Sequence, residues 1–390
     1  MDFTLPEELK MLQAVTRRFV QEELLPVEKQ VEQTGEFPEE IRLPLKKKAI
    51  ALGLYSCAMP AEYGGGGLGT MGRVVVSEEL GKVSVAVGLA GGIIGGTRST
   101  AGGVTDAEFA TPEQLEKYVL PVIRGEKECW MALTESNSGS GDLGMMETRA
   151  VKDGDNYIIN GTKIFITAID ISDFGYVLAV TDPERKRNGG VTCFIVDNDN
   201  PGLIIGRHIE CMGRRGLKSY ELVFDNCLVP AGNIFGVIGG GMDIFVADMN
   251  SVRLCVSATC LGMAQRALDM SKSYAKERIT FGQPLSRRQS IQEMIVYAET
   301  SIHASRLMLH HTAWEADQGI DVTHRVMMLK AHVPKVACRI IDDAMQIHGG
   351  FGYSKDLPLE MMYRDARLYM IGDGAVQVLE WAAARNLLRD

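Results

Sequence analysis

Residues 157–167 read YIINGTKIFIT, and this stretch decides the fold because it changes the periodicity of the chain. Two β-rich runs, 157–159 and 164–167, flank Asn160-Gly161, a dipeptide typical of tight turns between antiparallel strands. Similar runs follow at 176–180 (YVLAV) and 193–196 (CFIV), with Asp153-Gly154 and Asn188-Gly189 as further turn signals. We therefore expect a small antiparallel β-barrel or sandwich in this part of the chain.

Helical periodicity dominates on both sides of this segment. After it, four amphipathic patterns succeed one another, over 254–268, 291–309, 326–347 and 376–383. Such a succession favours an antiparallel bundle. The predicted fold is α+β, mainly α, and 390 residues leave room for several domains. The predicted domains are an N-terminal helical domain (1–130), a middle β-domain (131–235) and a C-terminal four-helix bundle (236–390).

The composition is that of a globular protein with an acidic surface. Hydrophobic residues make up 46% of the chain, and the formal net charge of -9 argues against binding nucleic acid or an anionic membrane. The N-terminus lacks a secretory apolar region, and no run nears the ~18 apolar residues of a spanning helix. The eight cysteines are scattered without zinc-site spacing. We therefore expect reduced thiols, no metal and a cytoplasmic location.

A glycine motif near the C-terminus looks faintly like a dinucleotide-binding loop. In a Rossmann unit, Gly349-Gly350-Phe351-Gly352 would have to follow a strand and open a helix. Here the glycines follow a helical segment, 344–348, and no parallel βαβ pattern is present. We reject the Rossmann interpretation, and the motif alone indicates a helix C-cap.

Seven short motifs gain their meaning from their joint order and spacing. Any one is weak, but seven in register resemble the acyl-CoA dehydrogenase family over essentially the whole chain. The motifs are MALTE (131–135), SNSGSGD (136–142), NGTKIFIT (160–167), ERITFG (277–282), QIHGG (346–350), YRDAR (363–367) and IGDG (371–374).

The resemblance implies the family's chemistry and assembly. It implies FAD between the middle and C-terminal domains, an acyl-CoA substrate, and electron-transferring flavoprotein as the electron acceptor. It also implies a homotetramer built as a dimer of dimers. In the implied reaction a base removes the α-proton while the β-hydrogen leaves as a hydride to flavin N5.

Position by position, the resemblance assigns FAD-binding residues. Thr134 and Thr167 match hydroxyls that bond the isoalloxazine edge, and Phe165, where the family commonly has Trp, can cover the ring. Arg278 and Phe281 match residues that reach the FAD of a neighbouring subunit, where a guanidinium suits a phosphate. The other matches are Met131, Leu133, Ser140, Ile166, Thr280, Gln289, Gln346, Gly349, Gly350, Ala375 and Gln377.

Substrate-side positions follow from the same resemblance. They are Ser140, Asn188, Asn250, Arg253, Gly374 and Arg98. Arg98 either pairs with a substrate carboxylate or faces solvent. Two departures from the family pattern affect hydrogen bonding. Ser136 and the extra Gly141 alter the loop over the pyrophosphate and CoA, and Ala375 lacks the hydroxyl that relatives commonly have at this position.

A third departure concerns the catalytic base. The family's commonest base is a Glu in Glu-Gly-Thr, and this chain has Asp373 there. The second known location holds Val252, so either Asp373 is the base or another group handles the proton. We predict Asp373. Because Asp is one methylene shorter than Glu, the α-carbon of the substrate should lie closer to the helix.

Glycines indicate the shape of the acyl group. Gly372 leaves open space where relatives often carry a bulky residue, and Gly91, Gly92, Gly95 and Gly96 fall in the segment that lines the acyl chain in relatives. We expect a wide pocket for α-branched or ring-bearing acyl groups. Cyclohexanecarboxyl-CoA-like and benzylsuccinyl-CoA-like substrates are the two concrete candidates.

Two other flavoprotein functions stay open. A nitroalkane-oxidase-like enzyme would also use Asp at position 373, would need no CoA and would consume oxygen. The unbroken 363–367 segment favours the dehydrogenase. The third possibility is an acyl-CoA-binding flavoprotein without the usual base, such as a reductase or a non-oxidising scaffold.

Overall fold

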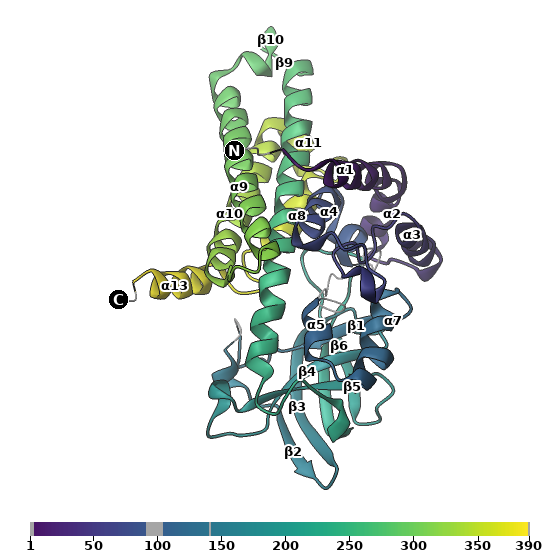
Figure 1. Cartoon of the computed structure of the whole chain (residues 1–390). Coiled ribbons are helices and arrows are strands. Elements are labelled where there is room, and N and C mark those ends of the chain that lie inside the picture. Colours follow the sequence, from purple (N-terminus) through teal and green to yellow (C-terminus); the bar gives the residue numbers. More distant parts are fainter. Residues whose placement is uncertain (1–3, 91–103, 140–141, 389–390) are drawn as a thin grey trace.

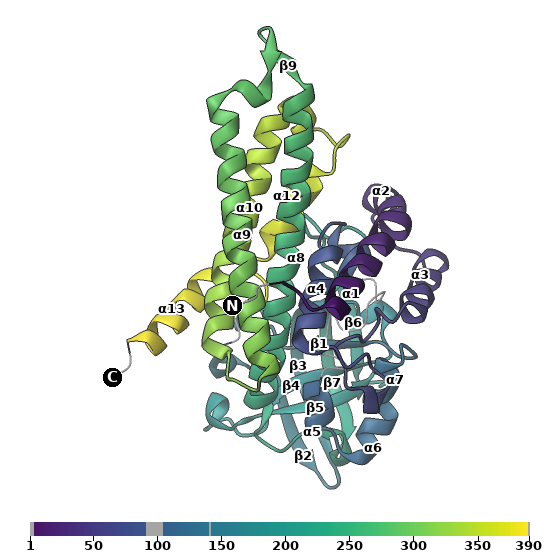
Figure 2. The ribbon, with the colours of Figure 1, turned by 45° about the horizontal axis from the view of Figure 1, so that its top comes forward.

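The computed structural model describes residues 4–90, 104–139 and 142–388. They form a helical N-terminal region, a middle β-sheet and a C-terminal helical bundle (Figure 1). The bundle extends away from the sheet, and the N-terminal helices pack against its side (Figures 1 and 2). This arrangement agrees with the predicted order of helical, β and helical segments.

The N-terminal helices bury an apolar core that includes Leu24, Val31 and Leu54. An ion pair between Glu28 and Arg266, with N–O distances of 2.8 Å, joins this region to the bundle. The helices are α1 (Glu7–Phe19), α2 (Leu25–Thr34), α3 (Glu39–Ala51), α4 (Gly69–Leu80), α5 (Val104–Phe109), α6 (Pro112–Gln114) and α7 (Leu120–Ile123), with π-helical turns at Val20–Leu24, Ala86–Ala90 and Leu115–Val119.

The middle region is an eight-stranded sheet in the order β6-β7-β3-β2-β4-β5-β8, with β1 paired to β4. Most pairs are antiparallel as predicted, but the sheet is mixed because β1 and β2 both pair parallel with β4. Trp130, Ile159 and Phe194 are wholly buried in its core. The strands are β1 (Cys129–Ala132), β2 (Arg149–Asp153), β3 (Asn156–Thr167), β4 (Phe174–Val180), β5 (Val191–Asp197), β6 (Leu203–His208), β7 (Ser219–Pro230) and β8 (Ile234–Phe235).

The prediction of a turn at Asn160-Gly161 is wrong. Strand β3 continues through both residues, and its register with β7 shifts between Ile159 and Gly161. Gly161 has φ 151°, and a Cβ there would lie 2.5 Å from the Thr148 hydroxyl. The glycine therefore serves a β-bulge with a close neighbour and not a hairpin turn.

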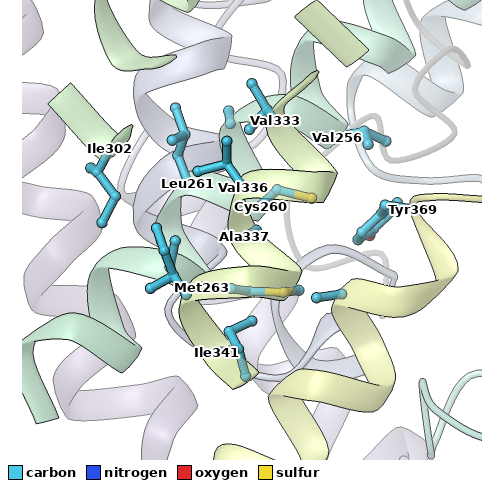
Figure 3. Packing of buried hydrophobic residues seen from close by; sticks show 14 of the residues in the cluster. Val256, Cys260, Leu261, Met263, Ile302, Val333, Val336, Ala337, Ile341 and Tyr369 are labelled. Carbon is cyan, nitrogen blue, oxygen red and sulfur yellow. The ribbon is translucent and has the colours of Figure 1, made fainter. Parts of the chain in front are cut away.

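The C-terminal region is a bundle whose core lies between α8, α9 and α10. Figure 3 shows Leu261, Ile302, Val333 and Ile341 packed together there. Helix α12 is absent from the predicted helices because ten residues show too few repeats of a helical period. The elements are α8 (Gly241–Glu277), β9 (Ile279–Thr280), β10 (Gln283–Pro284), α9 (Gln289–Asp317), α10 (Thr323–His348), α11 (Gly350–Tyr353), α12 (Leu359–Leu368) and α13 (Val376–Leu387).

Helix α8 is the one described helix that is long and apolar enough, by length and composition, to cross a membrane. However, 67% of its apolar window is buried inside the protein. Burial by neighbouring helices is what a central bundle helix requires.

Asp365 on α12 ties the three regions together. Its carboxylate accepts hydrogen bonds from the N–H of Val85 (3.0 Å) and from the N–H of Arg214 (2.5 Å), which precedes β7. Burial raises the pKa of this carboxyl to about 6, although the two N–H donors favour its charged form. Asp365 therefore fixes a loop of the sheet against the bundle.

Candidate active site

The predicted residues fall into three groups in space. We name them the β3 group (Thr134, Phe165 and Thr167), the Asp373 loop (residues 372–374) and the bundle tip (Arg278, Phe281, Gly349 and Gly350). Each group is built by different elements.

The β3 group owes its geometry to a second bulge. The register between β3 and β7 shifts between Lys163 and Ile166, and Phe165 has φ 58°. The Phe165 side chain is 54% exposed, whereas Ile166 is only 3% exposed. The Thr134 carbonyl accepts a hydrogen bond from the N–H of Ile164 at 2.9 Å, which keeps the loop after β1 beside the bulge. The exposed ring is thus free to cover a planar ligand.

A buried ion pair anchors that loop. Lys163 is wholly buried, and its Nζ donates to the Glu135 carboxylate (2.9 Å) and the Leu133 carbonyl (3.0 Å). Glu135 also accepts from the N–H groups of Glu147 (2.7 Å) and Thr148 (3.0 Å). Burial lowers the pKa of Lys163 to about 8. Burial alone would raise the pKa of Glu135, but Lys163 and the other donors bring it below its ordinary value.

Thr167 has two polar neighbours. Its hydroxyl lies 3.1 Å from the Ser219 hydroxyl and accepts a hydrogen bond from Nη2 of Arg214 at 3.4 Å. Nε of Arg214 is buried and has no partner in the described part of the chain. The guanidinium therefore brings positive charge and a spare donor to this edge of the sheet.

The Asp373 loop connects α12 to α13 and is held by two cations. Asp373 has φ 55°, and its carbonyl accepts a hydrogen bond from Nε of Arg253 on α8 at 3.0 Å. The carbonyls of Gly372 and Gly374 both accept from Nζ of Lys330 on α10. Asp373 itself stays partly exposed.

Both cations are buried, with Arg253 7% and Lys330 0% exposed. Burial lowers the pKa of each, that of Lys330 to about 8, while the negative charge of Asp373 opposes this shift. The charge of Asp373 therefore favours the protonated form of both cations, without forming an ion pair with either within the described residues.

Asn250 lies about one turn before Arg253 on α8. Its Nδ2 donates to the Thr323 hydroxyl at 2.7 Å, while its Oδ1 is buried without a partner among the described residues. A buried oxygen without a donor is costly, so it suits a ligand that carries one. Gly374 has φ 99°, and a Cβ there would lie 3.3 Å from Nη2 of Arg253.

The bundle tip borders a cavity of about 520 Å³ lined by Tyr274, Arg278, His348 and the two glycines. Gly349 ends α10 with φ 60°, which agrees with the predicted C-cap. Nothing lies within 4 Å of a Cβ built on Gly349 or Gly350, so their backbone is open to a ligand. Phe281 has φ 49° and is 98% exposed, as expected of a residue that contacts another molecule.

The bundle tip and the β3 group do not meet within one chain. The bundle tip follows the C-terminal end of α8, beside β9 and β10 and away from the sheet (Figure 1). The β3 group lies at the sheet, where Thr167 contacts Arg214 and Arg214 binds Asp365 on α12. Arg253 and Gly374, by contrast, do lie together with Asp373.

The remaining predicted residues are dispersed. Ala375 is the N-cap of α13 and makes no side-chain capping bond, and Gln377 is exposed on the same helix. Asn188 is exposed between β4 and β5. Thr280, Gln289 and Gln346 belong to the elements of the bundle tip, and Met131, Leu133 and Ile166 to those of the β3 group. Ser140, Gly141, Arg98, Gly91, Gly92, Gly95 and Gly96 lie outside the described residues.

The roles of Lys330, Arg214 and the Glu135–Lys163 pair are not among the predictions from the sequence. A signal was present for Lys330, because it follows Val326 by four residues and so continues an apolar helical stripe. A charge in a core-facing position calls for a partner. Arg214 offered no such pattern, since it sits in a loop.

Family models match almost the whole chain. The acyl-CoA dehydrogenase N-terminal domain matches residues 6–126, the middle domain residues 130–227 and the C-terminal domain residues 239–388.

Relatives that match over nearly their whole length are named as reductases or dehydrogenases. A 3-(aryl)acrylate reductase of Clostridium sporogenes is 36% identical over 98% of this chain and 99% of its own length. Subunit CarC of the caffeyl-CoA reductase–Etf complex of Acetobacterium woodii is 35% identical, over 98% of this chain and 99% of its own. The structure of butyryl-CoA dehydrogenase from Megasphaera elsdenii superposes with a TM-score of 0.92 at 30% identity, covering 100% of both chains.

Proposed function

Because this chain belongs to the acyl-CoA dehydrogenase family, whose members are oxidoreductases acting on CH–CH bonds, we propose that it dehydrogenates an acyl-CoA thioester between its α and β carbons. The observation that carries the proposal is the Asp373 loop. It presents a partly exposed carboxylate beside two buried cations, at the family's position for the base.

The family is FAD-dependent, and the described residues fit FAD. The exposed Phe165 ring offers an aromatic face, and Thr167 offers a hydroxyl beside the Arg214 cation. At the bundle tip, Arg278 and the open Gly349-Gly350 backbone offer the charge and close approach that a pyrophosphate needs. FAD, when bound, supplies the acceptor for a hydride.

In the proposed reaction Asp373 takes the α-proton. The α C–H bond breaks with its proton going to the carboxylate, the β-hydrogen leaves as a hydride, and a C=C bond forms. No backbone carbonyl among the described residues accepts a hydrogen bond from the N–H of Asp373. This N–H can therefore donate to the thioester oxygen, where negative charge develops.

A second candidate is the reverse reaction, reduction of an enoyl thioester, which the names of the two reductase relatives favour. The same residues would serve it, because protonated Asp373 would return the proton to the α-carbon. Assays in both directions separate the two candidates. Turnover of a nitroalkane with oxygen, in place of either thioester reaction, would contradict both.

The partners that we propose follow from the same family. Electron-transferring flavoprotein is supported by the relative that works in a reductase–Etf complex. The separation of the bundle tip from the β3 group supports pairing of subunits, since two subunits can complete one FAD site. The family resemblance extends this pairing to a homotetramer. We propose a cytoplasmic location, in keeping with the acidic charge and scattered cysteines.

The wild-type protein should purify yellow and oligomeric with about one FAD per chain, and Arg278→Ala should weaken FAD binding. Hydrogen bonds to a charged group contribute about 1.5–3 kcal/mol, so the loss should be about 10–100-fold in affinity. FAD retention after gel filtration measures this. Arg287→Ala, which removes a neighbouring exposed arginine, is the control. A colourless monomer that FAD cannot reconstitute would contradict the proposal.

Gly372→Leu should discriminate between substrates. A Cβ at position 372 would make ordinary contact with Leu368, at 3.6 Å, so the backbone tolerates a side chain. The wild-type enzyme should prefer ring-bearing or α-branched thioesters. The variant should lose about 10-fold or more in kcat/KM for those, but little for butyryl-CoA. If butyryl- or octanoyl-CoA is the best wild-type substrate, the wide-pocket interpretation is wrong.

A further inference from the structure

The backbone of the Asp373 loop is held at three successive carbonyls. Lys330 donates to the carbonyls of Gly372 and Gly374, and Arg253 donates to the carbonyl of Asp373 at 3.0 Å. The two cations come from different helices, α10 and α8, so both sides of the loop are fixed to the bundle.

The conformation of Asp373 explains why the loop needs such support. Its φ of 55° lies in the left-handed region, which non-glycine residues adopt only when their surroundings impose it. Gly374, with φ 99°, continues the unusual path. Without outside hydrogen bonds the aspartate would relax toward ordinary φ values and move its carboxylate.

Lys330 is specialised for this task. Its side chain is 0% exposed, and no ion pair of Lys330 occurs within the described ranges. Burying an ammonium group is costly unless its donors are satisfied. Here the carbonyls on either side of Asp373 satisfy them. A lysine placed only for packing would be better replaced by an apolar residue.

We propose that Lys330 is a positioning residue for the α-proton base. By donating hydrogen bonds to the carbonyls of Gly372 and Gly374, it determines the position of the Asp373 carboxylate relative to the substrate. This inference rests on the proposed base role of Asp373. Lys330 reaches the backbone and not the reacting atoms, so it acts only through Asp373.

Lys330→Met tests the inference, because it keeps the length of the stem and removes the N–H donors. Misplacement of a reacting group by about 1 Å can cost ~10²-fold, so flavin reduction under anaerobic conditions should slow by about that factor. FAD content and the Kd for acyl-CoA should stay at wild-type values. The kinetic isotope effect with an α-deuterated substrate should grow, because proton removal becomes the slow step.

Two further variants separate positioning from other roles. Lys335→Met removes an exposed lysine of α10 that pairs with Glu380 on α13, and this variant should reduce flavin normally. In the double variant K330M/D373N, the lysine substitution should cost little beyond D373N alone, because the base that it positions is gone. Additive losses, or loss of FAD from K330M, would indicate a structural role and overturn the inference.

The outcomes also separate this inference from the proposed function. If D373N is slow while K330M matches wild type in rate and isotope effect, only the positioning role of Lys330 fails. If D373N itself reduces flavin normally, the base assignment fails first. If K330M does not fold, the same isotope measurement is made on Lys330→Gln. The glutamine side chain is shorter and cannot donate hydrogen bonds to both carbonyls. An unchanged isotope effect there would equally overturn the inference.

Discussion

Asp373→Asn should bind FAD and acyl-CoA as the wild type does, yet reduce its flavin at least about 10³-fold more slowly. Asparagine keeps the size and polarity of aspartate but cannot accept the α-proton, and general-base catalysis contributes typically ~10²–10⁴-fold. Arg253 and Lys330 bind backbone carbonyls at this loop, so the substitution leaves their hydrogen bonds in place. Rapid mixing under anaerobic conditions measures the rate.

Two controls sharpen this prediction. Asp342→Asn removes an exposed carboxylate from α10 and should leave the rate unchanged. Asp373→Glu should not improve the preferred substrate, because the pocket is built for the shorter base, and any gain should fall on linear thioesters. A D373N enzyme with nearly the wild-type rate would mean that another group takes the proton.

Glu135→Gln should lower the free energy of unfolding by about 3–5 kcal/mol, the usual loss when one partner of a buried ion pair is removed. The Glu135 carboxylate receives three donors, Nζ of Lys163 and the N–H groups of Glu147 and Thr148. The amide nitrogen of glutamine must face at least one of them, and Lys163 loses its counter-charge. Denaturant unfolding of the holoenzyme measures the change.

The comparison variants for this pair lie close by. Glu147→Gln alters an exposed side chain in the same segment and should leave stability unchanged. Replacing both partners, Glu135→Leu with Lys163→Met, should recover much of the loss, because apolar pairs often substitute for buried ion pairs. A cost below about 1 kcal/mol for E135Q alone would show that the pair is not anchoring the loop.

The sequence predicted the order of helical and β segments because hydrophobic periodicity is a local property. It failed at Asn160-Gly161, where the need for glycine comes from Thr148, which directly precedes the neighbouring strand β2. A dipeptide cannot report a contact made across a sheet. The exposure of Phe165 depends on a bulge of the same kind, so its position was predictable only through the family resemblance.

In the candidate site, too, single residues were predictable, but the contacts between them were not. Resemblance named Asp373 and Arg253 separately, but the bond between the Arg253 guanidinium and the Asp373 carbonyl joins residues 120 positions apart. Lys330 donates hydrogen bonds to the Asp373 loop, more than 40 residues further along the chain. Its place in an apolar stripe signals a buried charge, but no sequence pattern names its partners.

The most direct test of the proposed dehydrogenation is a single anaerobic turnover of the holoenzyme with a ring-bearing acyl-CoA, followed by mass analysis of the thioester. We expect flavin bleaching and about one α,β-unsaturated thioester formed per FAD reduced. With the α-position deuterated, that product should have lost one deuteron to solvent through Asp373. A flavin that stays oxidised with ring-bearing, α-branched and linear acyl-CoAs alike, or that bleaches without forming an unsaturated product, would contradict the proposed dehydrogenation.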